Sequence, residues 1–254
     1  MLTLFKTCYY HYQVHAWLNI NMKLYKQLIA LIVCSPFLLS CGNTDTGAKR
    51  IVLGTSNIVY IPNILQFSLP FVVQVTRDSE HPAPGAVVAI TIKPVRYFKG
   101  VFSPFDSDGD GAADLWSLGL GYTASCAAED SNNNSVLDSG EDINNNGRLE
   151  PTYPVTVDSD PSLTPTVTLG TGTIITNQDG FGYFVVTYPQ SEGRWTRIEV
   201  TATAQVTGTE ENEVYTLTLP GLAADLVYVP TNPVYPPGGT TSRYGSSAVC
   251  TDDL

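Results

Sequence analysis

Oxygen-bearing groups recur at alternate positions over residues 130–141. Six residues supply them: Asp130, Asn132, Asn134, Asp138 and Glu141 through their side chains, and Val136 through its backbone carbonyl. A short loop that offers oxygens at its first, third, fifth, seventh, ninth and twelfth positions wraps around a calcium ion. We therefore predict a calcium-binding loop over residues 130–141, named the first loop below.

The same spacing starts again directly after Glu141, in residues 142–150, the second loop. Its oxygens come from Asp142, Asn144, Asn146, the Arg148 carbonyl and Glu150, and Gly147 stands at the sixth position. Amides replace several acids in both loops. The lower charge predicts weak affinity, which suits the millimolar calcium found outside cells.

A third acidic stretch, residues 106–114 or the third loop, contains Asp106, Asp108, Asp110 and Asp114. Ser117 occupies the twelfth position, where a Glu would complete the set, so we expect one ligand from elsewhere in the chain. We predict two or three calcium ions in total, because magnesium tolerates such multidentate cages poorly. The alternative for all three loops is an Asx-rich linker that is disordered or forms turns without an ion.

The first loop resembles an EF-hand loop, and the third resembles the Asp-rich loops of thrombospondin type 3 and dockerin-like repeats. Ser135 departs from the EF-hand pattern, because a Gly normally makes the sharp turn there. A left-handed Ser costs roughly 1 kcal/mol. No amphipathic helix is evident beside the loop, so we expect a calcium loop without the EF-hand helix pair.

Short segments rich in branched and aromatic residues must position these loops. The predicted strands are residues 57–61, 67–76, 86–93, 96–102, 166–169, 172–176, 181–188, 195–206 and 213–219. Residues 103–152 interrupt them as a polar insert that is poor in strand pattern. The sequence therefore predicts an all-β fold, an antiparallel β-sandwich over residues 51–229, followed by an extended tail at 230–254.

Three of these segments, residues 84–92, 175–188 and 198–203, resemble the bacterial immunoglobulin-like domains of the invasin and intimin type. The last of them reads Ile-Glu-Val-Thr-Ala-Thr. The resemblance implies an immunoglobulin-like sandwich. The departures are Asn177-Gln178, where the family usually has Thr-Asp, and the unusually long insert.

The N-terminal segment resembles a bacterial lipoprotein leader. Met22 opens a stretch with two lysines, followed by an apolar run at 27–39 that is too short to span a bilayer comfortably. It ends in Leu-Leu-Ser-Cys at Cys41, which is similar to a lipobox, whose Cys is acylated. This implies a leader at 1–41, a tether at 42–50, and a lipid anchor in the outer membrane, facing the periplasm or the medium. The alternative is an ordinary signal peptide or membrane anchor with a chance Cys.

The net charge limits which partners this protein can bind. Residues 42–254 hold all 24 acids but only 10 of the 13 basic residues, an excess of 14 acids. This argues against binding to nucleic acid and against electrostatic docking on anionic lipid.

Two cysteines, Cys126 and Cys250, remain after the leader. They are predicted to pair in an oxidising compartment, and the alternative is two free thiols.

No residue pattern predicts an enzyme. The single His of residues 42–254, His81, lies in a Pro-rich turn, and no nucleophile elbow, zinc spacing or nucleotide-binding motif occurs. Trp116 and Trp195 form either a partner-binding face or core. We predict a non-enzymatic, lipid-anchored envelope protein that mediates adhesion or binds a protein or glycan. The alternatives are a structural subunit of an envelope assembly or filament and, weakly, a carbohydrate-active hydrolase.

Overall fold

The computed structural model describes residues 50–56, 58–77, 81–151, 156–159, 172–204 and 211–252, with the backbone alone at 156–159. The predicted leader, the Cys41 lipidation site and the predicted strand at 166–169 lie outside the described residues. No helix in the described part of the chain is long and apolar enough to cross a membrane.

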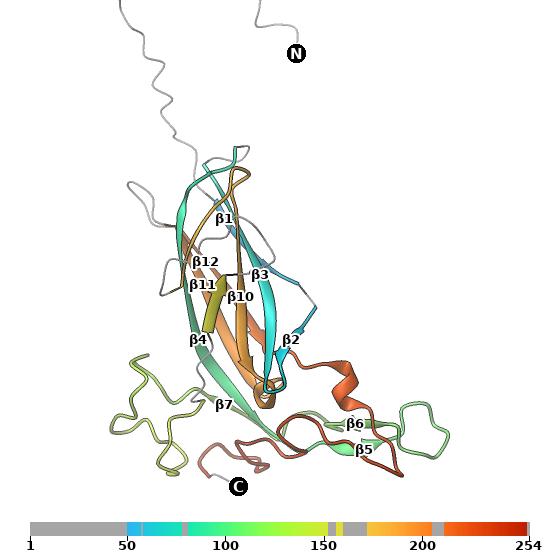
Figure 1. The fold of residues 1–254 in the computed structure, drawn as a ribbon. Coiled ribbons are helices and arrows are strands. Elements are labelled where there is room, and N and C mark those ends of the chain that lie inside the picture. The colour runs from blue at the N-terminus through green and yellow to red at the C-terminus, as the bar shows by residue number, and fades with distance from the viewer. Residues whose placement is uncertain are drawn as a thin grey trace, which may run out of the picture. The chain divides into compact units, whose positions relative to one another are not determined.

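Two antiparallel sheets make up the fold (Figure 1). The first sheet has the order β1-β3-β10-β8, with β2 also paired to β3; these are β1 (Arg50–Thr55), β2 (Tyr60–Asn63), β3 (Gln66–Thr76), β8 (Thr156–Ser159) and β10 (Phe181–Pro189). The second has the order β12-β11-β4-β7, with β9 also paired to β4; these are β4 (Val87–Lys99), β7 (Ala124–Ala127), β9 (Thr173–Ile175), β11 (Thr196–Ala204) and β12 (Glu211–Thr218). The prediction of an all-β antiparallel sandwich with an Asp-rich insert is confirmed.

The hydrophobic core lies between the two sheets. In β11, alternate side chains are fully buried, which is the period-two pattern expected of a strand with one face on a core. Phe71 of β3 stacks on Phe184 of β10 at 5.1 Å between ring centroids and meets Tyr215 of β12 edge-on at 6.0 Å. Phe71 and Phe184 belong to the same sheet, so of these two contacts the one with Tyr215 joins the sheets. Burying a Phe ring fully contributes about 1.5–3 kcal/mol.

Strand β4 runs through Pro94 as one 13-residue strand. The register against β11 shifts between Arg197 and Ile198, so that Arg197 pairs with Arg96 and Ile198 pairs with Pro94. This bulge accommodates a residue that has no backbone N–H to donate. The predicted strands at 86–93 and 96–102 are therefore one strand, which ends at Lys99.

The polar insert contains more strand than its sequence indicates. It begins with a small two-stranded sheet of β5 (Ser103–Phe105) and β6 (Leu115–Ser117), and β7 joins the edge of the second sheet. Each of these strands has only three or four residues. Such short strands are set by tertiary pairing rather than by local propensity, which is why the sequence pattern missed them.

The insert leaves the sandwich at the end opposite to the start of β1. Arg50 pairs with Thr76, whereas Gln66, at the other end of β3, pairs with Pro189. The connection from β10 to β11 follows Pro189 and carries the short 3-10 helix η1 (Gln190–Glu192). The end of β4 meets this connection, because the Phe98 amide donates to the Trp195 carbonyl at 2.8 Å. The insert and the start of β1 therefore lie at opposite ends of β3 (Figure 1).

Candidate metal centres in the insert

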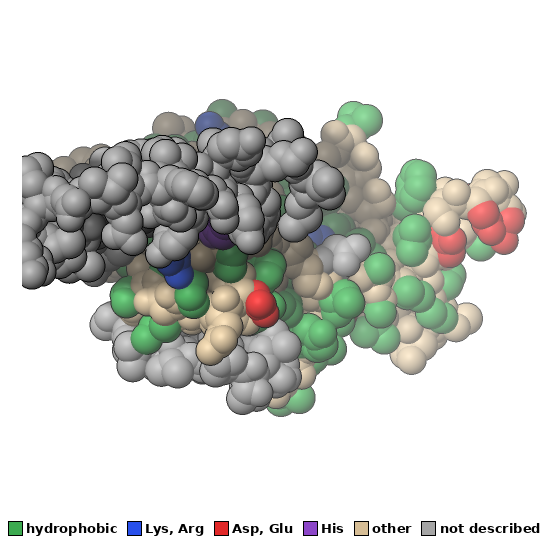
Figure 2. Space-filling model, turned by 90° about the horizontal axis from the view of Figure 1, so that it is seen from above, with side chains coloured by type: hydrophobic (Ala, Val, Ile, Leu, Met, Phe, Trp, Pro, Cys, Tyr) green, Lys and Arg blue, Asp and Glu red, His purple; other side chains and the backbone are tan. Residues whose placement is uncertain are grey.

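The third loop forms the tip of the β5–β6 hairpin. Asp106, Asp108 and Asp110 each offer a carboxylate oxygen, and these oxygens lie within 4.8 Å of one another, so the group could hold a metal ion. Asp106 is half-buried and the other two are exposed. Acidic side chains gather at one edge of the molecule in the space-filling view (Figure 2). Three of the four sequence-predicted residues of this loop are thus brought together, and Asp114 is not in this group.

Backbone amides hold the first carboxylate of the third loop in place. Asp106 accepts hydrogen bonds from the amides of Gly109 and Gly111 at 2.7 and 2.8 Å. Both glycines have positive φ, 80° and 92°, which lets the backbone curl around the carboxylate. The bonds from Gly111 and Gly109 lower the pKa of Asp106, so it is ionised at neutral pH.

The third loop closes on its own ninth residue. Asp114 accepts the Ser107 amide at 2.8 Å with one oxygen and the Ser107 hydroxyl at 2.6 Å with the other. Ser117 instead caps the following turn, accepting the Gly119 amide. The further ligand that we expect from elsewhere in the chain stays a prediction.

The first loop has the same framework. The Asp130 carboxylate accepts the amides of Asn134 and Ser135 at 3.0 and 2.9 Å. Ser135 has φ 60°, the left-handed conformation that its position requires. Glu141 closes the loop, because its carboxylate accepts the amides of the second residue, Ser131, and the ninth, Asp138, at 2.9 and 3.0 Å.

The second loop repeats the contacts of the first Asp. Asp142 accepts the amides of Asn146 and Gly147 at 3.0 and 2.9 Å, as Asp130 does in the first loop. Its ninth residue, Glu150, accepts the side-chain amides of Asn144 and Asn146 at 2.9 and 3.0 Å.

The ninth residue of the first loop is bound in the same way. Asp138 accepts the side-chain amides of Asn132 and Asn134 at 2.8 Å each. In each loop, the side-chain amides of the third and fifth residues thus hold the acid at the ninth position.

Glu129 is a residue of this site that the sequence analysis missed. Its carboxylate accepts the Ile143 amide at 3.1 Å and the Glu150 amide at 3.0 Å, which are the second and ninth amides of the second loop. Glu141 makes the equivalent pair of contacts in the first loop. Its position in the sequence could have identified it, because Glu129 directly precedes the first loop just as Glu141 directly precedes the second.

Three carboxylates of this region are buried without a basic partner. Glu129 is 1% exposed, and Glu141 and Glu150 are each 6% exposed. None of the ion pairs in the described part of the chain involves them. Burial raises the pKa of Glu129, although the amides of Glu150 and Ile143 oppose the shift. Burying unpaired carboxylates is costly, and a divalent cation among these oxygen donors would offset that cost.

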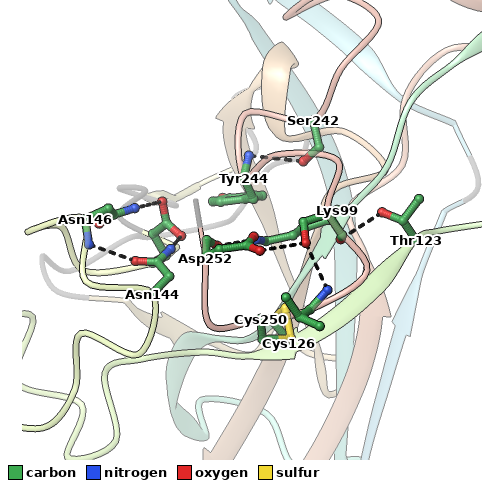
Figure 3. A network of polar contacts seen from close by, with 12 residues as sticks. Lys99, Thr123, Cys126, Asn144, Asn146, Ser242, Tyr244, Cys250 and Asp252 are labelled. Carbon is green, nitrogen blue, oxygen red and sulfur yellow. Dashed lines mark hydrogen bonds and ion pairs between the residues drawn. A yellow bond between two sulfur atoms is a disulfide. The ribbon is translucent and has the colours of Figure 1, made fainter. Parts of the chain in front are cut away.

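The C-terminal tail packs beside this region (Figure 3). The predicted bond between Cys126 of β7 and Cys250 is confirmed, with 5.5 Å between their Cα atoms. Lys99 is fully buried, and its ammonium donates to the backbone carbonyl and side chain of Asp252, the latter at 3.1 Å. Lys99 and further backbone bonds to residues 240–245 hold the tail in addition to the disulfide.

The two tryptophans lie in the core rather than on an open face. Trp195 is buried and meets Phe102 edge-on at 5.1 Å, and Trp116 is buried against Tyr228 at 4.8 Å. Among the aromatic side chains around Trp116, Tyr235 is exposed, with its ring centroid 5.6 Å from that of Trp116. The packing therefore supports the second of the two alternatives, that these tryptophans belong to the core and not to a partner-binding face.

No protein-family model and no curated protein matches this chain.

Proposed function

We propose that this protein is a non-enzymatic, lipid-anchored module of the cell envelope. In this proposal calcium orders the three loops, and the ordered insert presents a surface that binds a protein or glycan. The observation that carries the proposal is the hydrogen-bond framework shared by the loops, in which the first Asp accepts the amides of the loop's turn and a further acid accepts the amide of the second residue. The donors are all oxygens, which suits calcium.

A polar insert needs a source of order other than hydrophobic burial. Ordering a residue costs about 1–2 kcal/mol in backbone entropy, and segments of low hydrophobicity do not recover this by burial. Bound calcium and the Cys126–Cys250 bond supply alternative stabilisation. The disulfide also favours a location outside the reducing cytosol.

The placement of the loops supports a display role. β3 has 11 residues, and at roughly 3.3 Å per residue it separates the tether end of the sandwich from the loop end by about 35 Å. A lipid on Cys41 would hold the tether end at the membrane, so the loops would point away from it. This geometry favours adhesion or binding at the loop end.

Calcium titration calorimetry tests the proposal. The protein with Cys41→Ser is compared with the same protein carrying Asp130→Ala or Asp142→Ala. We expect two or three ions, with one lost in each variant, and we then expect partner binding to depend on calcium. An absence of heat at millimolar calcium in the unsubstituted protein would overturn the proposal.

A second candidate function is a structural subunit of an envelope assembly. Residues 51–76 carry no charged side chain. Residues 58–65, which contain β2 and its turn into β3, expose several large apolar side chains, namely Ile58, Tyr60, Ile61, Ile64 and Leu65. An uncharged exposed edge favours strand pairing with a neighbour. Light scattering after gel filtration separates the two functions, because a binding module stays monomeric and a subunit forms oligomers.

A further inference from the structure

We propose that the first and second loops close each other. Glu129, which lies outside both loops, supplies the closing carboxylate of the second calcium site, and the two ions therefore bind cooperatively. This inference rests on the proposed calcium function and assigns a ligand and a coupling that the loop spacing alone does not contain.

The contacts of Glu129 place it where the second loop lacks a residue of its own. In the first loop, the twelfth residue, Glu141, accepts the second and ninth amides. In the second loop, the twelfth position is Tyr153, which has no carboxylate. Glu129 accepts the second and ninth amides there, through its two separate oxygens. A carboxylate held in this way has the position of the acid that closes a calcium loop.

The chain makes this closure reciprocal. Glu129 is joined by a peptide bond to Asp130, the first residue of the first loop, and Glu141 is joined to Asp142, the first residue of the second. The Glu129 amide also donates to the Glu150 carbonyl at 2.7 Å, so the start of one loop is tied to the end of the other. An ion that orders either loop therefore also positions the closing acid of the neighbouring loop. The second ion then binds to a site that is already partly ordered, so its binding loses less conformational entropy.

Tyr97 gives independent support for a ligand at the second loop. Its side chain is fully buried, and its hydroxyl and the Thr76 hydroxyl are the two buried side-chain oxygens without a hydrogen-bond partner among the described residues. Tyr97 pairs across the sheet with Cys126, three residues before Glu129. The carboxylates of Glu129 and Glu150 add to burial in raising its pKa, so the hydroxyl lies within the field of both acids.

An unsatisfied buried hydroxyl costs about 1–3 kcal/mol. The ninth residue of a calcium loop often binds the ion through a water molecule, and Glu150 is the ninth residue here. A water ligand of the second ion would give the Tyr97 hydroxyl its missing partner. The orphaned hydroxyl and the placement of Glu129 thus point to the same site.

The test follows each loop separately by NMR during calcium titration of the full-length protein with Cys41→Ser. The sixth residue of each loop donates its amide to the first Asp, so the amide shifts of Ser135, Gly147 and Gly111 report the first, second and third loops. We expect the Ser135 and Gly147 amides to shift together with a Hill coefficient above one, and the Gly111 amide to shift independently.

Glu129→Gln is the decisive variant, and Glu213→Gln, an exposed acid on β12, is its matched control. Removing an outer-shell group alone costs about 10–100-fold in metal affinity, so loss of a direct ligand should weaken the second loop at least tenfold. The Hill coefficient should fall to about one. Glu213→Gln should leave both unchanged, and Tyr97→Phe should weaken the second loop by less than Glu129→Gln does.

Two further variants keep the test open if Glu129→Gln does not fold. Asp130→Asn in the first loop should raise the calcium midpoint of Gly147, whereas Asp106→Asn in the third loop should not. If calcium shifts the reporter amides but neither Glu129→Gln nor Asp130→Asn moves the Gly147 midpoint, mutual closure is wrong and calcium binding stands. If no amide shifts at millimolar calcium, the proposed function and this inference both fail.

Discussion

Replacing Ser135 with Gly should strengthen calcium binding by the first loop. Ser135 has φ 60°, and an L-residue in this conformation costs about 1–2 kcal/mol. Gly removes that strain but adds about 0.5–1 kcal/mol of conformational entropy to the disordered state. The net gain is about 0.5–1 kcal/mol, which corresponds to a roughly two- to five-fold tighter first site.

The second loop provides the matched reverse substitution. Gly147 stands at the same sixth position with φ 74°, and a Cβ built there meets no atom within 4 Å. Gly147→Ser therefore introduces backbone strain without a steric clash, and it should weaken the second site by a similar factor.

Calorimetry, or the amide shifts of the two loops, measures both changes. The strain argument is refuted if Ser135→Gly fails to tighten the first site and Gly147→Ser leaves the second unchanged. A loss of affinity in Ser135→Gly would also contradict it, because the Ser side chain would then be contributing to the ion site.

Three further predictions concern the sandwich and the tail. Phe71→Ala should lower the free energy of unfolding by about 3–5 kcal/mol, measured with urea, and leave calcium stoichiometry unchanged. Reducing the Cys126–Cys250 bond, which closes a loop of 124 residues, should destabilise the fold by roughly 4–5 kcal/mol in the chain-entropy model, again measured with urea, with both thiols titratable afterwards. Burial raises the pKa of Glu192 to about 7, so the native state holds a proton that the unfolded state has lost between pH 4.5 and 7. Stability from this group is full below pH 4.5 and is lost as the pH rises through 7; Glu192→Gln should abolish that part of the pH dependence in urea melts.

Features that depend on local spacing could be predicted from the sequence. The ligand positions of the first and second loops follow from residue order, and the left-handed Ser135 follows from the sixth position of the pattern. The branched and aromatic residues of 195–206 identified β11. The disulfide followed from the only two cysteines left after the leader, because few pairings were possible.

Features that depend on contacts between distant segments could not be predicted. Glu129 closes the second loop through backbone amides 14 and 21 residues away, and such contacts have no signature in the spacing of the second loop itself. Tyr97 reads as an ordinary strand aromatic until its unpaired hydroxyl is placed beside the insert. The burial of Lys99 likewise depends on the tail returning to the end of β4.

Hydrogen exchange with and without calcium tests the central claim most directly. The amides to follow are those of the insert, residues 103–151, and those of the core strands β3, β10 and β11 as an internal reference. We predict that chelation with EGTA lowers protection throughout the first, second and third loops and leaves the core strands unchanged. Equal protection of the insert in both conditions would contradict the account, because the loops would then be ordered without calcium.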